Sequence, residues 1–417
     1  MIRPTLATVD LAAIQANLRE IQRLLTRDPI TNPGEGNASA AARATLRQAQ
    51  GRPERSRRSS GSEAARAARK TDTRVIAVLK ANAYGHGASE AGRALEQAGA
   101  SMLACADIEE GVSLRESGVR LPILVFGALS VSDLDGVFEY QLTPTVSTPA
   151  AARALERAAA GRNVRLRCHL KIDTGMNRLG FRHDNLHRTM PEVLGSAHLE
   201  IEAAYTHFAT ADQPESPFLD EQRVRFDRAT AALAAMGLRG FTQHAANSAA
   251  VLRDARTWYD AVRPGLLLYG IVPPPLAAGD LQLRPALSLT SRIVAVKGLR
   301  PGEGTGYGLR WSADAPRSIA IVPAGYADGL DTRLSGRGMV LVRGRRVPIV
   351  GSVCMDMIMI DVTGLDVSPG DEVVLIGRQD GEQITARETA AAIGSIPWEV
   401  TCRLGSRIQR RYEARET

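Results

Sequence analysis

The sequence contains no run of about 18 consecutive apolar residues, the length that a helix needs to cross a membrane. Residues 1–15 also lack the cationic region, the apolar stretch and the cleavage site of a secretory signal peptide. We therefore expect a cytoplasmic protein with no membrane partner. The 417 residues, of which 44% are hydrophobic, are enough for a large core and for two domains.

Cysteine is scarce as well. The four cysteines, at positions 105, 168, 354 and 402, lie far apart and form no CxxC pair. Disulfide frameworks and structural zinc sites depend on paired or closely spaced cysteines. The sequence therefore predicts reduced thiols and no metal site.

Lysine is rarer than any other charged residue. Lys70, Lys80, Lys171 and Lys297 are the only lysines among 52 basic residues, and the rest are arginine. An amine can form a Schiff base or be carbamylated, whereas a guanidinium does neither. Each remaining lysine is therefore a candidate for such chemistry, with chance as the alternative explanation for a set of only four.

Large apolar residues almost disappear between residues 31 and 71, where Ala, Arg, Ser and Gly dominate. Such a composition cannot offset the entropy of ordering the chain, so we expect a disordered insertion. Residues 34–70 hold nine basic residues against three acidic ones, which is six of the seven net positive charges. Because the rest of the chain is nearly neutral, we expect no nucleic-acid partner. A nucleic-acid-binding arm is the less favoured interpretation of the insertion.

The apolar pattern changes twice along the chain. It predicts an amphipathic helix over residues 11–25 with Asp10 as its N-cap. Eight apolar segments then alternate with helical ones, at residues 74–79, 102–106, 123–127, 143–147, 166–172, 201–206, 241–244 and 262–268. This alternation predicts a (β/α)₈ TIM barrel with its site at the strand C-termini.

Strand-like runs broken by Gly and Pro follow from about residue 283, at residues 319–322, 339–342, 347–350, 358–362 and 372–376. We therefore expect the α/β class, with a barrel domain over residues 1–282 and a mainly β C-terminal domain over residues 283–417.

One lysine stands directly at the end of the first of the eight strands, in AVLKANAYGHG (77–87). A strand-end amine is poorly hydrated, which lowers its pKa and suits a nucleophile that attacks an aldehyde cofactor. Composition alone favours a plainer interpretation, in which Lys80 reaches solvent at the barrel rim.

The complete string resembles the cofactor-lysine motif of bacterial alanine racemases almost residue for residue. The resemblance covers nearly the whole chain outside residues 31–70, through HLKIDTGMNRLGF (169–181), YTHFATAD (205–212), HAANSAA (244–250), VRPGLLLYG (262–270), GYG (306–308), GYADG (325–329) and CMD (354–356). It implies an enzyme that uses pyridoxal 5'-phosphate to interconvert L-alanine and D-alanine and so supplies D-alanine for peptidoglycan.

Within this resemblance, Lys80 corresponds to the lysine that binds the cofactor and acts as a base on the D-face of the substrate. Tyr307 corresponds to the tyrosine that acts on the L-face. In the family this tyrosine comes from the β domain of the partner subunit, which implies a homodimer with shared active sites. Both groups ordinarily have pKa values of about 10, so their surroundings must favour the basic forms.

Two further residues correspond to the family's cofactor-ring contacts. Arg263 matches the arginine at the pyridine nitrogen, and His207 matches the histidine that links it to the catalytic tyrosine. An arginine cannot give its proton to the ring, which makes the cofactor a weaker electron sink and holds down side reactions such as transamination. Taken alone, His207 is more often a structural histidine and Arg263 a surface salt-bridge partner.

The resemblance also assigns the phosphate site to Tyr84, to Ser248 and to the backbone N–H groups of Gly265 and Leu266. Glycine lets the main chain approach an anion closely.

The substrate carboxylate is assigned to Arg178 and to the backbone N–H of Met355, which in the family comes from the partner subunit. Lys171 matches a lysine that is often carbamylated and then holds that arginine. Without the carbamate, Lys171 and Arg178 would be close like charges, so we expect a compensating anion. Tyr326 and, adjacent to it, Asp356 are assigned to the entrance passage. Taken alone, Met355 is an apolar strand residue.

One position departs from the family. Many members have a tyrosine near the C-terminus that binds the phosphate and narrows the entrance, but GSRIQRRY places Ser406 there. The shorter side chain leaves a broad-specificity racemase of the same fold open. A pyridoxal-phosphate-binding regulatory protein without turnover is a further alternative, but its single-domain relatives lack a β domain with Tyr307. A decarboxylase of the same architecture would carry an acidic residue in place of Arg263.

Overall fold

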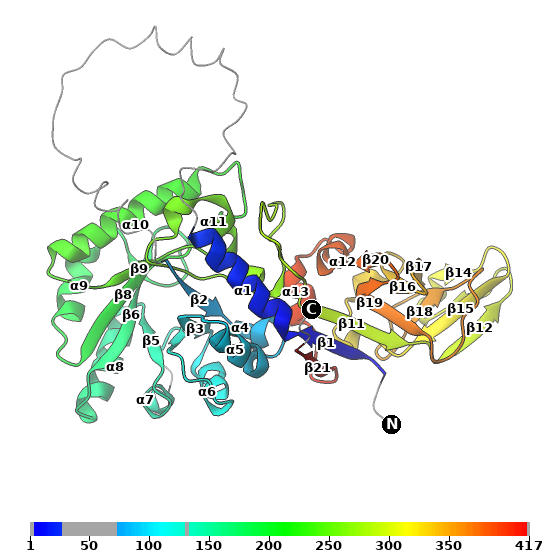
Figure 1. Ribbon diagram of the computed structural model, residues 1–417, viewed down its shortest axis with the longest axis horizontal. Coiled ribbons are helices and arrows are strands. Elements are labelled where there is room, and N and C mark those ends of the chain that lie inside the picture. Colours follow the sequence, from blue (N-terminus) through cyan, green and yellow to red (C-terminus); the bar gives the residue numbers. More distant parts are fainter. Residues whose placement is uncertain (1–3, 27–72, 130–132, 415–417) are drawn as a thin grey trace, which may run out of the picture.

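The computed structural model describes residues 4–26, 73–129 and 133–414. The insertion expected at residues 31–70 lies outside these ranges, so its disorder stays a prediction. Figure 1 shows two bodies placed end to end, a barrel wrapped by helices and a body built mainly of strands. None of the helices in the described ranges combines the length and the apolar character needed to span a membrane.

Eight parallel strands form the barrel and follow one another around it in chain order. Pairing of the fourth strand with the fifth, and of the last with the first, closes the ring. The strands are β2 (Arg74–Val78), β3 (Met102–Cys105), β4 (Ile123–Val125), β5 (Thr143–Val146), β6 (Leu166–Asp173), β8 (Leu199–Tyr205), β9 (Thr242–His244) and β10 (Ala261–Val262), with the short β7 (Phe181–Arg182) beside β6. The predicted (β/α)₈ barrel is confirmed.

The last barrel strand is shorter than the sequence pattern indicated. We expected a strand over residues 262–268, but β10 ends at Val262, and the 3₁₀-helix η4 (Leu266–Tyr269) follows. Pro264 has no amide hydrogen to donate to a neighbouring strand, so the chain leaves the sheet there. The apolar run that looked like a strand packs instead against the first helix.

Helices cover the outside of the barrel (Figure 1). They are α1 (Leu11–Leu25), α5 (Ala88–Gln97), α6 (Ile108–Glu116), α7 (Asp135–Glu139), α8 (Pro149–Gly161), α9 (Leu186–Leu194), α10 (Phe218–Ala235) and α11 (Ser248–Arg253), while α4 (Lys80–Tyr84) follows β2 directly. The helix predicted over residues 11–25 is confirmed with its cap, because the Asp10 carboxylate accepts a hydrogen bond from Ala13 N at 2.8 Å.

Alternate residues of the barrel strands belong to two apolar layers. In β2, Val75 and Ala77 pack with the helices in the main core, whereas Ile76 and Val78 belong to a separate cluster with Met102 of the next strand. Because neighbouring residues of a strand point to opposite faces, the second cluster fills the inside of the barrel. Polar groups are therefore left to gather at the ends of the strands.

The second body is built around one mostly antiparallel sheet, in the order β12-β15-β18-β17-β16-β19-β11-β1-β21. Its strands are β1 (Leu6–Asp10), β11 (Leu287–Arg292), β12 (Ala295–Leu299), β15 (Arg317–Val322), β16 (Met339–Val342), β17 (Arg345–Val350), β18 (Ile358–Asp361), β19 (Glu372–Gln379) and β21 (Gln409–Glu413). The hairpin β13 (Gly304–Thr305) and β14 (Trp311–Ser312), the short β20 (Glu382–Ile384) and the helices α12 (Ala386–Ala392) and α13 (Pro397–Cys402) complete it. The mainly β character expected after the barrel is confirmed.

Strand β1 belongs to this sheet although it precedes the barrel in the chain. It pairs with β11 in antiparallel and with β21 in parallel orientation. The sheet is thus built from both ends of the sequence. A domain boundary at residue 282 stays a prediction, and residues 6–10 pair on the C-terminal side of it.

Candidate active site

Lys80 lies at the end of β2, separated from it by Leu79 alone. Its side chain is half-buried. Burial lowers the pKa of Lys80 from its ordinary value, and the nearby positive charge of Arg178 lowers it further. The neutral amine, which is the nucleophilic form, is therefore easier to reach than in an exposed lysine.

The turn that follows Lys80 is left-handed. Ala81, Asn82, Ala83 and Tyr84 all have positive φ angles, between 52° and 55°. This conformation costs an L-residue about 1–2 kcal/mol and is rarely adopted by several residues in succession. Contacts from outside the turn must therefore stabilise it.

C-terminal residues supply some of these contacts. An added Cβ at Gly85 would overlap the Thr401 carbonyl oxygen, and one at Gly87 would overlap the Tyr412 hydroxyl. The guanidinium Nε of Arg410 donates a hydrogen bond to Gly85 O at 2.7 Å. The glycines of AYGHG are thus required because the C-terminal segment packs directly on this turn.

Tyr84, Ser248 and Gly265 come together beside the turn. The backbone N–H of Gly265 donates to the Ser248 hydroxyl at 3.0 Å, and Leu267 N lies 3.4 Å from the same oxygen. A Cβ at position 265 would stand 2.6 Å from the Tyr84 hydroxyl. Leu266, the fourth residue assigned to the phosphate, opens η4, where the first N–H groups have no acceptor within the helix.

Arg263 is buried, with 3% of its surface exposed, and burial lowers its pKa to about 10. Its guanidinium donates to Thr206 O at 2.6 Å, to Ala245 O at 2.9 Å and to His244 Nδ1 at 2.7 Å. His207 Nδ1 lies 3.4 Å away. All of these acceptors are neutral. For His207 this follows from its pKa, which burial, and after it the charge of Lys171, lowers well below the usual value. The arginine is therefore solvated by dipoles.

Two histidines connect Arg263 to a carboxylate. His244 Nε2 lies 3.0 Å from His169 Nδ1, and His169 Nε2 lies 3.1 Å from a carboxylate oxygen of Glu202. A guanidinium can only donate, so His244 must accept at Nδ1 and carry its proton on Nε2. His169 must then carry its proton on Nε2 and donate to Glu202. Burial lowers the pKa of both rings, which keeps them neutral.

Tyr205 is the aromatic centre of the site. Its ring stacks on His244 at 4.8 Å, and the Lys171 amine and the Arg263 guanidinium lie 4.6 Å and 5.0 Å from the ring centroid. Its hydroxyl bonds with Thr145 at 2.9 Å, and burial raises the pKa of Tyr205 to about 12. The Arg263 cation and the Lys171 amine thus contact the electron-rich face of a neutral phenol.

Strand register brings these groups together, since Lys171, Tyr205 and His244 are paired residues on neighbouring strands. Sequence reasoning missed Tyr205, His169, His244 and Glu202 as site residues. Three of them were present in the quoted strings, at strand positions. An alignment of the strand ends would have placed Tyr205 and His244 in one row with Lys171, with His169 two residues before it.

Lys171 is buried, and its pKa is lowered far from the ordinary value by burial and then by the charges of Arg263 and Arg178. Arg178 itself is exposed, on the turn that follows β6. That turn folds back on the lysine, because a Cβ at Gly180 would stand 2.9 Å from Lys171 Cγ. The like charges expected here are thus brought close together, and the strain is relieved if Lys171 is neutral.

The remaining predicted residues gather on loops of the C-terminal body. Tyr307, in η5 (Tyr307–Leu309), is 78% exposed, Met355 is 51% exposed and Tyr326 is 44% exposed. Tyr326 N donates to Cys354 O at 3.0 Å, and the Ser352 hydroxyl donates to Tyr307 O at 2.7 Å. The GYG, GYADG and CMD strings therefore form one surface.

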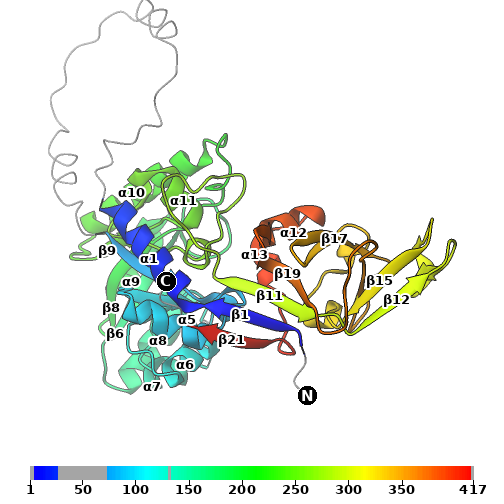
Figure 2. The same ribbon diagram turned by 45° about the vertical axis from the view of Figure 1, so that its right-hand side comes forward.

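The part of this surface with Tyr307 lies away from the barrel of the same chain. Tyr307 stands in the β13–β14 hairpin, and both views place the end of the body that carries β12 and β15 opposite the barrel (Figures 1 and 2). Asp356 makes an ion pair with Arg407 at 2.7 Å, next to the exposed Ser406. The hairpin that carries Tyr307 thus lies at the end of the C-terminal body that is far from the barrel with Lys80.

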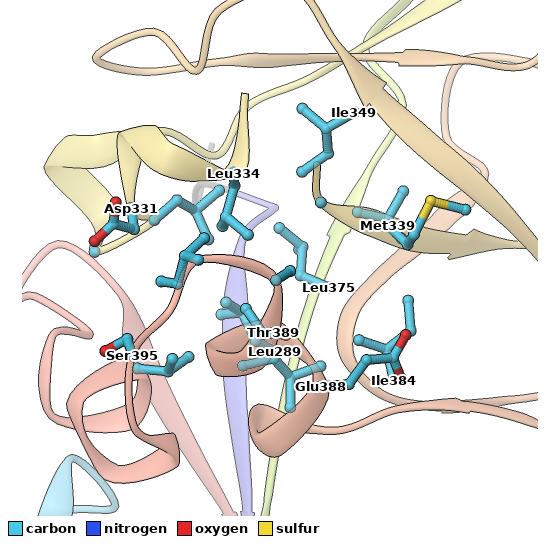
Figure 3. Close-up of a pocket in the computed structure, with 18 of the residues that line it drawn as sticks. Leu289, Asp331, Leu334, Met339, Ile349, Leu375, Ile384, Glu388, Thr389 and Ser395 are labelled. Atoms are coloured by element: carbon cyan, nitrogen blue, oxygen red, sulfur yellow. The ribbon is translucent and has the colours of Figure 1, made fainter. Parts of the chain in front are cut away.

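An apolar pocket with an empty volume of about 750 Å³ lies inside the C-terminal body. Its walls include Leu289, Leu334, Met339, Ile349 and Leu375 (Figure 3). None of the predicted site residues lines it. Arg337 and Arg403 are among its lining residues, but no lysine or histidine is, so we do not take it as the catalytic site.

Comparisons with known proteins agree along the whole chain. The family model for the N-terminal domain of alanine racemase matches residues 61–273, and the model for the C-terminal domain matches residues 286–412. An alanine racemase of Symbiobacterium thermophilum is 38% identical over 412 residues, which is 99% of this chain and 97% of the relative. One of Carboxydothermus hydrogenoformans is 42% identical over 340 residues, which is 81% of this chain and 92% of the relative.

Solved structures agree as well. The alanine racemase of Bacillus anthracis with bound L-Ala-P superposes with a TM-score of 0.82 at 32% identity, over 99% of this chain and 96% of that one. The alanine racemase of Streptomyces lavendulae superposes with a TM-score of 0.85 at 29% identity, over 100% of this chain and 98% of that one. The chain therefore belongs to the alanine racemase family.

Proposed function

We propose that the chain is an alanine racemase (EC 5.1.1.1) that holds pyridoxal phosphate on Lys80 and interconverts L-alanine and D-alanine in the cytoplasm, where D-alanine is used for peptidoglycan. One observation carries the proposal. In a member of this family, a half-buried lysine with a lowered pKa lies two residues after β2, where the charges of Arg178 and Arg263 act on it.

The residues around Lys80 fit a phosphorylated aldehyde. The hydroxyls of Tyr84 and Ser248 and the N–H groups of Gly265 and Leu266 would hold the phosphate, and a side chain at position 265 would leave it no room. Arg263 would donate to the pyridine nitrogen. When bound, pyridoxal phosphate supplies an electron sink that acidifies the α-proton of an amino acid.

Two groups of this chain would act directly on alanine. The amine of Lys80 would move the proton on the D-face, and its lowered pKa favours the neutral form that can accept a proton. The guanidinium of Arg178 would bind the substrate carboxylate, for which its paired donors are suited.

The second base would be the partner's Tyr307. The exposure of Tyr307 and its position remote from Lys80 support a homodimer in which each barrel receives the loops of the other copy. His207 would then link the partner's Tyr307 to Arg263, from which it lies 3.4 Å away. The N–H of the partner's Met355 would bind the carboxylate, and the partner's Tyr326 and the partner's Asp356 would line the entrance.

Lys171 would be carbamylated. Carbon dioxide reacts with a neutral amine, and burial together with two nearby arginines favours the neutral form of Lys171. The nitrogen would bond to the carbon of carbon dioxide and release a proton to solvent, and the single negative charge so formed would offset part of the positive charge of Arg263 and Arg178. Within the described ranges, no carboxylate forms a salt bridge with Lys171.

The decisive experiment incubates the purified protein with a panel of L-amino acids and measures the D-products by chiral chromatography. We expect D-alanine to dominate and Lys80→Ala to lower its formation by at least ~10⁴-fold, because both the cofactor linkage and one base are removed. Lys297→Ala, at an exposed lysine of β12, is the matched control. D-alanine formation at the wild-type rate by Lys80→Ala would refute the proposal.

The same panel tests a second candidate function, a broad-specificity racemase. Ser406 is exposed and shorter than the family's tyrosine, which favours a wider entrance. Comparable rates for alanine and for larger amino acids would select this alternative.

A further inference from the structure

The left-handed turn after Lys80 is held by one side chain from a neighbouring helix. A carboxylate oxygen of Glu110 accepts a hydrogen bond from Ala81 N at 2.6 Å, and the other accepts one from Ala106 N at 2.8 Å. Ala81 directly follows Lys80, and Ala106 follows β3, the strand that pairs with β2. The carboxylate thus joins the ends of two adjacent barrel strands beside the candidate nucleophile.

Helix capping does not explain these bonds. Glu110 is the third residue of α6, whose N-cap Asp107 accepts a hydrogen bond from Glu110 N at 2.8 Å. A glutamate in this position ordinarily turns back to the N–H of the N-cap residue. Here both oxygens are directed to residues before the helix, while the Asp107 bond fixes the helix end that carries them.

The charge of Glu110 also acts on Lys80. Burial and the charges of Arg178 and Arg263 lower the pKa of Lys80, whereas Cys402 and Glu110 raise it. Of these four groups, Glu110 is the one that contacts the backbone of the residue next to Lys80. It is therefore suited to fix both the direction and the protonation of the amine.

We propose that Glu110 is a positioning residue for Lys80, which holds the left-handed turn through Ala81 N and so directs the amine towards the cofactor. The inference rests on the proposed function only in assigning the cofactor to Lys80. Two variants separate the effect of the charge of Glu110 from the effect of its side-chain length. Glu110→Gln keeps the length and removes the charge, whereas Glu110→Asp keeps the charge and shortens the side chain. Glu109→Gln, at the exposed neighbouring position, is the matched control.

Two measurements on the full-length protein test the proposal. The dissociation constant for pyridoxal phosphate is measured by titrating cofactor-free protein and following the visible absorbance. Separately, cofactor-free protein is labelled with trace acetic anhydride over a range of pH, and the labelling of Lys80 is compared by mass spectrometry with that of exposed Lys297. The scarcity of lysine makes both peptides easy to resolve.

Glu110→Gln is expected to weaken cofactor binding by at least about tenfold, since an amide cannot accept from two N–H groups as a carboxylate does. The labelling midpoint of Lys80 should move to lower pH, because a negative charge that favours the protonated amine is lost. Glu110→Asp should weaken binding without this movement, and Glu109→Gln should change neither quantity.

Wild-type binding and an unchanged midpoint in Glu110→Gln would overturn the proposal. A midpoint that rises to that of Lys297 would mean that the turn has opened, which again assigns its support to Glu110. If Glu110→Gln is insoluble, wild-type cofactor affinity in Glu110→Asp overturns the proposal instead. Labelling needs no cofactor, so a wild-type protein that takes up no pyridoxal phosphate would contradict the proposed function and leave this test intact.

Discussion

The two groups of candidate site residues differ in how far one chain completes them. Around the barrel strand ends, Arg263, His244, His169 and Tyr205 are buried and joined by hydrogen bonds and ring contacts. On the C-terminal body, Tyr307 and its neighbouring loops are ordered by backbone hydrogen bonds, but their side chains face outwards. The barrel group is assembled by folding, and the loop group needs a further surface.

This difference indicates a division of work. A group that must bind a cofactor and tune its electronics benefits from fixed, dry surroundings, because preorganised dipoles act most strongly there. A base that must approach the opposite face of the substrate cannot be built from the same wall. Under the proposed function a second copy would supply this base, and the activity would then depend on association.

Lys80→Ala apart, the largest effect should come from breaking the loop group. Tyr307→Phe removes one base and should reduce racemisation by at least ~10²-fold, while the visible absorbance of the bound cofactor stays intact. Tyr140→Phe, on the outer side of the barrel, should leave the rate unchanged. A near-wild-type rate in Tyr307→Phe would remove the assigned role.

Mixing two inactive variants tests whether the two bases of one site come from different subunits. In a hybrid of Lys80→Ala and Tyr307→Phe subunits, one of the two sites has both bases, so subunit exchange should restore roughly a quarter of the wild-type activity. Restoration is expected only if Lys80 and Tyr307 act across subunits. A mixture that stays as inactive as its components would show that each site belongs to one chain.

A smaller effect should come from the far end of the barrel network. Glu202→Gln keeps an acceptor for the His169 N–H but removes the charge, so the bond weakens by about 1 kcal/mol and the turnover rate should fall roughly fivefold. Glu200→Gln, on the same strand, is the control.

The direction of the hydrogen bonds has a test of its own. Nitrogen NMR of the His169 and His244 rings should report the Nε2–H tautomers in the wild-type protein and in Glu202→Gln. Loss of that pattern in the wild-type protein would contradict the assigned direction of the hydrogen bonds.

The smallest effect should come from a segment that belongs to neither group. Residues 34–69 lie outside the described ranges, and their composition predicts that deleting them leaves folding and activity essentially unchanged. Thermal unfolding and the racemisation rate of the deletion variant measure this directly. Loss of soluble protein on deletion would assign the segment a structural role.

The sequence predicted those parts of the architecture that depend on patterns within one short segment, such as hydrophobic periodicity and motifs. The helix over residues 11–25, its Asp10 cap and the eight barrel strands follow from spacing, and the family follows from the quoted strings. Local patterns could not show that apolar residues 266–269 leave the sheet, because burial looks alike in a strand and in a buried 3₁₀-turn. They also could not place β1, whose partners lie hundreds of residues away.

For the site, the motifs predicted which single residues take part but not the contacts between them. The link from Arg263 to Glu202 depends on the register of three strands, and the left-handed turn depends on a carboxylate 30 positions from Lys80. Neither of these contacts produces a recognisable residue spacing in the sequence, because the partners lie on different strands or helices. The residue roles themselves stay predictions, for which the variants above are the test.

The parallel pairing of β1 with β21 has a consequence for synthesis. During synthesis, β1 at residues 6–10 must wait without this neighbour until residues 409–413 have been made. Meanwhile the edge of that strand is open to pairing with other nascent chains, a hazard of slow long-range strand contacts. Until residues 409–413 pair with β1, this open edge is therefore a site at which unfinished chains can aggregate.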